Sequence, residues 1–235
     1  MGYNTQKKEF RAIMQRTIKS FVLRKGRISS RQQHALEHHV QKYELSFKQE
    51  NWDLDYLFGR AADTVIEIGF GMGASLAAMA VTHPEINFIG IEVHQAGVGS
   101  LAADLYDKSL TNVRIVSHDA VDVFKDCIAK NSLAGIQIFF PDPWHKKKHH
   151  KRRLIQPDFI ALLAQTLKPG GFIHCATDWE VYAMHMLEAL AKEPTLRNKM
   201  NEGFAPRPDS RPLTKFELRG QRLGHGVWDL IFIKK

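Results

Sequence analysis

Residues 64–74 read Thr-Val-Ile-Glu-Ile-Gly-Phe-Gly-Met-Gly-Ala. The first five are apolar or β-branched except for Glu67, which predicts a short buried strand. Glycines follow at positions 69, 71 and 73, and glycine lets the backbone approach a ligand closely where a strand turns into a helix. The segment therefore predicts the first strand-to-helix turn of an α/β domain, with a cofactor bound beside the glycines.

The residues after this turn repeat one pattern, in which short apolar runs alternate with longer helical stretches. This alternation is typical of a parallel sheet built from βαβ units. Two late runs with strand-like composition predict an antiparallel edge on that sheet. The expected fold class is α/β, with a mostly parallel, Rossmann-like sheet and an antiparallel C-terminal edge. The expected parallel strands are 64–68, 87–92, 113–117, 136–140 and 171–177, and the two late runs are 213–218 and 226–233.

Positive charge is concentrated before the sheet begins. The chain of 235 residues holds 33 Lys and Arg against 25 Asp and Glu, a formal net charge of +8, and most of this excess lies in the first fifty residues. Such a balance suits a nucleic acid or another polyanion. We expect residues 1–50 to form a basic, RNA-contacting extension, with a helix over 30–43 capped by Ser29 or Ser30, and residues 51–235 to form the catalytic domain.

Several classes of protein are disfavoured by the sequence. No apolar run approaches the ~18 residues of a membrane span, and the N-terminal residues lack the apolar core of a secretory signal. Cys127 and Cys175 lie far apart and offer neither a metal spacing nor a disulfide framework. We therefore expect a cytoplasmic protein that has no membrane contact, no metal and no obligate protein partner.

A second informative segment, Phe139 to Arg153, reads FFPDPWHKKKHHKRR. Asp142 stands at the carboxyl end of an apolar strand, where open α/β sheets bind their ligands. The positive charges that follow are dense enough to bind phosphates, and the same charges would repel a divalent ion from the nearby histidines. We expect an active site with a polyanion at its mouth.

Two cofactors compete for the glycine turn. With Ala74 it satisfies the relaxed dinucleotide pattern G-x-G-x-x-A, and Glu92, about twenty residues on, is placed to hold a ribose hydroxyl. Glu67, however, would repel a pyrophosphate and favours the ammonium and sulfonium of S-adenosylmethionine. Carboxylates also end the next strands, where Asp119 would meet an adenine amino group. The predicted cofactor-binding residues are Glu67, Gly69, Gly71, Gly73, Glu92, Asp119 and Asp142.

Motifs along nearly the whole chain, from about Phe21 onward, together resemble those of the bacterial tRNA (guanine-N7)-methyltransferases. The motifs are E-I-G-F-G-M-G, G-I-E-V-H, P-D-P-W-H-K-K, A-T-D-W-E, T-K-F-E and R-L-G-H-G-V-W-D-L. The resemblance implies methyl transfer from S-adenosylmethionine to N7 of guanine in tRNA, at position 46 of the variable loop. It also implies that Asp142 is the catalytic position. The substrate-binding residues that it implies are Lys146, Asp178, Thr214, Lys215, Phe216 and Glu217. The RNA-contacting residues that it implies are Lys148, His149, His150, Lys151, Arg152 and Arg153.

The chemistry of this reaction sets what the residues must do. Guanine N7 carries a lone pair and no proton, so we expect Asp142 to align the reactants and stabilise positive charge rather than abstract a proton. Asp178 and Glu217 are expected to accept hydrogen bonds from the guanine edge, and Trp144 or Phe216 to stack on the base. On the sequence, an NAD-dependent oxidoreductase and an RNA-binding module without catalysis stay open as alternatives.

Overall fold

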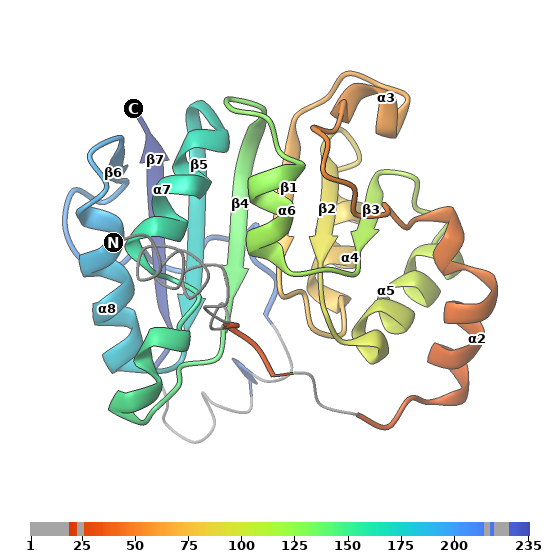
Figure 1. The fold of residues 1–235 in the computed structure, drawn as a ribbon, viewed down its shortest axis with the longest axis horizontal. Coiled ribbons are helices and arrows are strands. Elements are labelled where there is room, and N and C mark those ends of the chain that lie inside the picture. Colours follow the sequence, from red (N-terminus) through yellow and green to blue (C-terminus); the bar gives the residue numbers. More distant parts are fainter. Residues whose placement is uncertain (1–18, 23–25, 214–216, 219–225) are drawn as a thin grey trace, which may run out of the picture.

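The computed structural model describes residues 19–22, 26–213, 217–218 and 226–235. Within these residues the chain forms a seven-stranded sheet in the order β3-β2-β1-β4-β5-β7-β6 (Figure 1). The first five strands are parallel, whereas β7 is antiparallel to both β5 and β6. The predicted fold class is confirmed. The strands are β1 Thr64–Ile68, β2 Asn87–Ile91, β3 Val113–Val116, β4 Leu133–Phe139, β5 Leu167–Thr177, β6 Leu196–Asn198 and β7 Trp228–Lys234.

Helices cover both faces of the sheet, because every residue of the central strands β1 and β2 is buried and needs apolar partners on each side. One hydrophobic cluster joins the sheet to α6, α7 and α8, and a second joins it to α2, α4 and α5. The helices are α2 Ser30–His38, α3 Leu54–Phe58, α4 Ala74–Thr82, α5 Gln95–Asp107, α6 Ala120–Asp126, α7 Pro157–Thr166 and α8 Glu180–Ala191, with 3-10 turns η1 Val40–Lys42 and η2 Lys147–Arg152.

The antiparallel edge differs from the prediction in its partner strand. The second antiparallel strand is β6, not the run 213–218, of which Glu217 and Leu218 are helical. Arg211 and Glu217 form an ion pair at 2.7 Å, whereas a fully extended run would separate their Cα atoms by about 20 Å. Arg211 and Glu217, which are both among the described residues, therefore do not lie on one extended strand.

Helix α2 belongs to the basic extension and packs on α5. Ser29 caps it with a reciprocal capping box, as predicted, but the helix ends at His38 and η1 follows. A Cβ on Gly99 of α5 would lie 2.6 Å from the backbone oxygen of Gln32, so only glycine permits this close approach. Arg31 adds ion pairs to two α5 carboxylates. The predicted extension is thus packed against α5 through helix α2.

Among the residues that the structure describes, the helices are too short or too polar for any of them to cross a bilayer. The longest, α5, has 13 residues, whereas a span needs about 20.

Candidate active site

A cavity of about 210 Å³ opens at the carboxyl ends of the parallel strands. Its walls include Gly69 after β1, Glu92 after β2, Asp119 at the start of α6 and Asp142 after β4. These residues meet because the carboxyl ends of parallel strands share one edge of the sheet, and β1 lies between β2 and β4. The structure therefore brings together four of the predicted cofactor-binding residues.

The glycine turn begins at the wall of this cavity, with Gly69, whereas Gly71 and Gly73 do not line it. Gly69, Gly71 and Gly73 have φ angles of 74°, 58° and 77°, the left-handed region that side chains with a Cβ rarely adopt. A Cβ on Gly69 or Gly71 would meet nothing within 4 Å, so open space lies beside both residues. The turn also approaches α5 closely, since a Cβ on Gly97 would lie 2.1 Å from the backbone oxygen of Gly71. Backbone conformation and packing together require glycine here.

Glu92 ties the glycine turn to the turn that follows β2. One carboxylate oxygen accepts a hydrogen bond from the Gly71 N–H at 3.0 Å, and the other accepts from the N–H groups of Val93 and His94 at 2.7 and 3.0 Å. A carboxylate that accepts several backbone N–H bonds fixes the local chain conformation. Its predicted contact with a ribose stays a prediction, and the structure gives it this second role.

Glu67 has a different environment, because its carboxyl group is buried within β1 and only 3% of the residue is exposed. One of its oxygens has no hydrogen-bond partner among the described residues. Burial, with a further contribution from the negative charge of Glu92, raises the pKa of Glu67 to about 8. A buried carboxyl without a partner is costly, and a cationic ligand beside it would remove that cost. The donor set thus fits a cofactor that carries positive charge and no phosphate.

A short N-terminal segment, residues 19–22, completes the cavity wall; we call it the strap. Ser20 and Phe21 line the cavity, and the Ser20 carbonyl accepts a hydrogen bond from the Trp144 indole at 3.2 Å. The Lys19 ammonium pairs with Asp119 and reaches Asp122 at 3.6 Å. Asp119, predicted to meet an adenine amino group, therefore already accepts from a lysine. Sequence reasoning missed the strap, because its partners lie about a hundred residues away in the chain.

The loop that carries Asp142 is held in a strained conformation. Phe140 and Trp144 flank it with φ angles of 52° and 48°, and a left-handed backbone costs a residue with a side chain roughly 1–2 kcal/mol. Arg153 supports the loop from behind, since its Nε donates to the Pro143 carbonyl at 3.0 Å and its guanidinium lies 4.7 Å from the Tyr182 ring centroid. Asp142 itself is exposed at the cavity mouth.

Arg153 corrects one expectation. It was predicted to contact RNA, but only 3% of it is exposed and its guanidinium faces the protein interior. The hydrogen bond to Pro143 and the aromatic contact with Tyr182 account for this burial. In this conformation Arg153 supports the loop and presents no charge to a phosphate.

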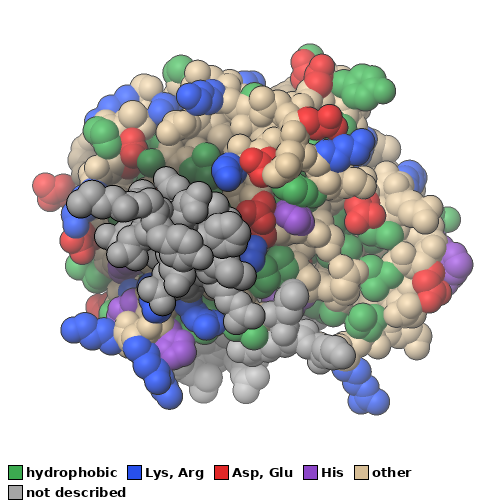
Figure 2. Space-filling model, in the orientation of Figure 1, with side chains coloured by type: hydrophobic (Ala, Val, Ile, Leu, Met, Phe, Trp, Pro, Cys, Tyr) green, Lys and Arg blue, Asp and Glu red, His purple; other side chains and the backbone are tan. Residues whose placement is uncertain are grey.

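The other basic residues lie on η2 and remain accessible. Lys148 and Lys151 are exposed, and Arg152 lies 5.1 Å from the Trp144 ring centroid. Lys, Arg and His side chains gather at the lower left of the face in Figure 2, in the region of η2. Desolvation and four neighbouring cations lower the pKa of His149, which opposes its protonation. Among the described residues no cluster of three or more His, Cys, Asp or Glu has the arrangement of a metal site.

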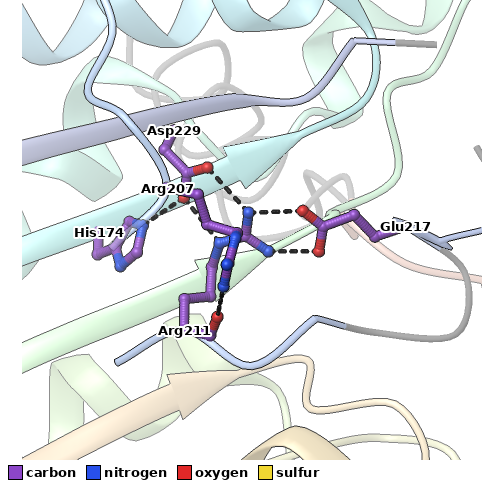
Figure 3. A network of polar contacts seen from close by, with 5 residues as sticks. All are labelled: His174, Arg207, Arg211, Glu217 and Asp229. Carbon is purple, nitrogen blue, oxygen red and sulfur yellow. Dashed lines mark hydrogen bonds and ion pairs between the residues drawn. The ribbon is translucent and has the colours of Figure 1, made fainter. Parts of the chain in front are cut away.

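The predicted substrate-binding residues are spread over three places. Lys146 is exposed in the loop after Asp142, and Asp178, after β5, lines a separate cavity of about 290 Å³ with Trp179 and Trp228. Glu217 is buried and bonded to Arg211 (Figure 3). The remaining predicted residues, Thr214, Lys215 and Phe216, lie outside the described residues.

Arg211 is a second residue that sequence reasoning missed. It bonds to Glu217 and to Asp229 on β7, and Asp229 in turn lies 2.7 Å from the Nε2 of His174 on β5. Figure 3 shows the guanidinium between the two carboxylates. The sequence holds no signal for this network, because Arg211 and helical Glu217 meet residues of two strands, β5 and β7, that only folding brings to them.

Comparison with known proteins finds both a matching protein family and proteins of similar sequence. A family model described as "Putative methyltransferase" matches residues 61–230. The tRNA (guanine-N(7)-)-methyltransferase of Legionella pneumophila (strain Lens) is 63% identical over 94% of this chain and 100% of its own length. The protein of the same name from Bordetella pertussis (strain Tohama I) is 56% identical, over 92% of this chain and 84% of its own length.

Solved structures share the fold at low sequence identity. The 16S rRNA methyltransferase KamB has a TM-score of 0.53 at 15% identity, over 79% of this chain and 95% of its own. The aminoglycoside resistance methyltransferase NpmB1 has a TM-score of 0.52 at 13% identity, over 78% of this chain and 92% of its own. At such identities the likeness extends to the fold alone.

Proposed function

The chain belongs to the tRNA (guanine-N7)-methyltransferase family, and from that premise we propose that it methylates N7 of guanine 46 in the variable loop of tRNA. One observation within the structure carries the proposal. An acidic cavity with a carboxylate at its mouth, Asp142, lies directly beside an accessible basic segment, η2. Acidic walls suit a cationic methyl donor, and the basic segment suits a phosphate backbone.

S-adenosylmethionine is the methyl donor. It supplies a methyl group bonded to a sulfonium, and the sulfur leaves as a neutral thioether when an electron pair attacks the methyl carbon. We infer that it is held by Glu67, Glu92, Asp119 and Asp142, and that the backbone of the glycine turn lies close to it. Support comes from the unpartnered buried oxygen of Glu67 and from the open space beside Gly69. A pyrophosphate-bearing cofactor would meet repulsion at the same carboxylates.

Asp142 acts by position and charge in this proposal. The N7 lone pair of guanine attacks the methyl carbon without losing a proton, so no general base is required. Transfer makes the purine cationic, and a carboxylate beside it stabilises that charge as it develops. The strained backbone at Phe140 and Trp144, and the Arg153 bond to Pro143, hold Asp142 in place for this task.

Recognition of tRNA is divided between two parts of the surface. Lys148, Lys151 and Arg152 on η2, with the basic extension 1–50, bind phosphates, and residues 51–235 perform the reaction. Trp144, which donates to the carbonyl of the cavity-lining residue Ser20, offers a ring on which the target base stacks. Asp178 accepts from the Watson–Crick edge of guanine. The cytoplasm, where tRNA is matured, is the compartment that this function requires.

The test is methyl transfer from labelled S-adenosylmethionine to an unmodified tRNA, followed by nucleoside analysis. We expect 7-methylguanosine, and its loss when guanine 46 of the transcript is replaced by adenine. Methylation that survives this replacement would contradict the position but not the reaction. A chain that binds tRNA and transfers no methyl group would instead be the non-catalytic RNA-binding module. The oxidoreductase alternative is inconsistent with the family.

A further inference from the structure

We propose that Gln137 of β4 is a positioning residue for Glu67, the buried carboxyl group of the cofactor site, and that its amide serves both protonation states of that group. In the free protein the amide oxygen accepts the proton of neutral Glu67. When the cofactor is bound, the amide turns and donates to the carboxylate. The proposal rests on the proposed function, because Glu67 is inferred to hold S-adenosylmethionine. Gln137 was absent from the residues predicted from the sequence.

Glu67 and Gln137 lie opposite each other in neighbouring strands of the sheet (Figure 1). They are partners in the parallel ladder between β1 and β4, in which Val65 also pairs with Gly135. Neighbouring strands lie about 4.8 Å apart, and partners in a ladder direct their side chains to the same face. Glutamate and glutamine side chains are long enough to span this distance, so the two end groups can meet.

Both end groups are buried, and each has an oxygen without a partner. Only 3% of Glu67 and 7% of Gln137 is exposed. The Oε2 of Glu67 and the Oε1 of Gln137 have no hydrogen-bond partner among the described residues. Two oxygens bond to each other only if one of them carries a hydrogen. A proton on Glu67 supplies it, and rotation of the amide offers an N–H in place of the oxygen. Either change satisfies both groups, as is usual for buried polar atoms.

The strand on the other side of Glu67 provides no competing partner. The residue opposite Glu67 on β2 is Gly90, which has no side chain. A Cβ added to Gly90 would meet the side chains of Leu76 and Phe70, so apolar groups fill the space there. Of the two strands that flank Glu67, only β4 therefore places a polar side chain opposite it.

The charged groups around the pair lie on either side of it. Burial, with a further contribution from the negative charge of Glu92, raises the pKa of Glu67 to about 8. On the far side, the ladder partner of Gln137 is His174, whose Nε2 lies 2.7 Å from Asp229. Asp229 also accepts from Arg211. These three residues bind one another, and Glu92 accepts from backbone N–H groups.

An amide that serves both states stabilises the ionised state more strongly. A hydrogen bond to a charged group is roughly twice as strong as one between neutral groups. Loss of Gln137 should therefore raise the pKa of Glu67 further in the free protein. The cofactor binds the ionised form, so its affinity should fall at a pH below this pKa. Above it, free and bound proteins lose the same bond, and affinity should not change.

The test is Gln137→Met, which keeps the approximate size of the side chain and removes the amide. Calorimetry measures the affinity for S-adenosylmethionine from pH 6 to pH 9, and each value is compared with wild type at the same pH, so that titration of the ligand cancels. We expect binding to be roughly fivefold weaker at pH 6 to 7 and equal to wild type at pH 9, a shift of the profile by roughly 0.7 pH unit.

Thr64→Val is the matched control. It removes a buried hydroxyl that also lacks a partner among the described residues and that lies at the other end of the same strand, β1. Its pH profile should equal that of wild type. In a Glu67→Gln background, Gln137→Met should change affinity by the same factor at every pH, because the group that titrates is absent.

Several outcomes would overturn the proposal. An equal loss of affinity at every pH in Gln137→Met would assign Gln137 to packing alone, and a wild-type profile would leave it with no role. Should Gln137→Met fail to fold, Gln137→Asn decides, because it withdraws the same amide by one methylene; a wild-type profile in that variant would end the proposal. Failure of the wild-type protein to bind S-adenosylmethionine would refute the proposed cofactor site, whereas wild-type binding with unaltered profiles in the variants refutes only the role of Gln137.

Discussion

Glu67 makes cofactor binding depend on pH in a way that follows from its burial. Its pKa is raised to about 8 by desolvation and by the charge of Glu92, so at pH 7 about nine-tenths of the molecules hold a proton there. A ligand that places a cation beside this carboxylate binds the ionised form. Binding of S-adenosylmethionine at pH 7 should therefore release about 0.9 proton from Glu67.

The sign of the dependence is fixed by the same reasoning. Affinity should rise about tenfold for each pH unit from pH 6 toward pH 8 and level off above it. Without ligand, a carboxyl whose pKa is raised in the folded state stabilises the fold below its unfolded pKa. This stabilisation is lost as pH rises from about 4.5 to about 8. Glu67→Gln should flatten both profiles.

Calorimetry in buffers of different ionisation enthalpy measures the protons released. The ligand's own amino group also titrates, so the quantity of interest is the difference between wild type and Glu67→Gln at the same pH. A difference close to zero at pH 7 would refute the reasoning, because Glu67 would then be ionised without the ligand or remain protonated with it. Unchanged cofactor affinity in Glu67→Lys would refute the contact altogether.

Three further predictions concern the loop, the basic segment and the glycine turn. Asp142→Asn should lower kcat by roughly 10²-fold with tRNA affinity retained, and a carboxylate-like limb in the wild-type pH profile that the variant lacks would restore a proton-transfer role. Lys151→Ala should reduce the log-log salt slope of tRNA binding by roughly one, whereas Arg153→Ala should leave the slope intact; filter binding across a salt series compares them. In Gly97→Ala the added Cβ would lie 2.1 Å from the backbone oxygen of Gly71. We expect this variant to bind S-adenosylmethionine at least about tenfold more weakly by calorimetry. Wild-type affinity would show instead that the glycine turn shifts to accommodate the methyl group without loss of binding.

The parallel strands could be predicted because each is buried on both faces and reads as an uninterrupted apolar run. Strand β1 has the expected bounds, and β2 and β3 end one residue early. The prediction of a strand at Leu213 to Leu218 was wrong. The run reads Leu-Thr-Lys-Phe-Glu-Leu, and its last residues alternate between charged and apolar side chains as in a strand. In the structure Glu217 and Leu218 are helical, and Glu217 is buried because Arg211 binds it. Strand β6, with three residues, is too short to show any period.

The residues of the candidate site likewise fall into those that the sequence could predict and those that it could not. Carboxylates at strand ends were predictable, because topology alone gathers them at one edge of the sheet. The roles of Lys19, Arg153 and Arg211 were not, since each depends on a distance between segments. A run of lysines and arginines does not reveal which of its members turns inward, as Arg153 does toward Pro143.

The position of strand β7 in the sheet affects how the chain folds during its synthesis. It is the last strand of the sheet in chain order, yet it lies inside the sheet, between β5 and β6. Until it emerges, β5 has an open edge, and unpaired edges invite association with other chains. Asp229, which anchors Arg211, arrives on the same strand. A nascent chain can therefore complete its glycine turn before β7 is made, whereas Arg211 gains its Asp229 partner only after β7 has emerged.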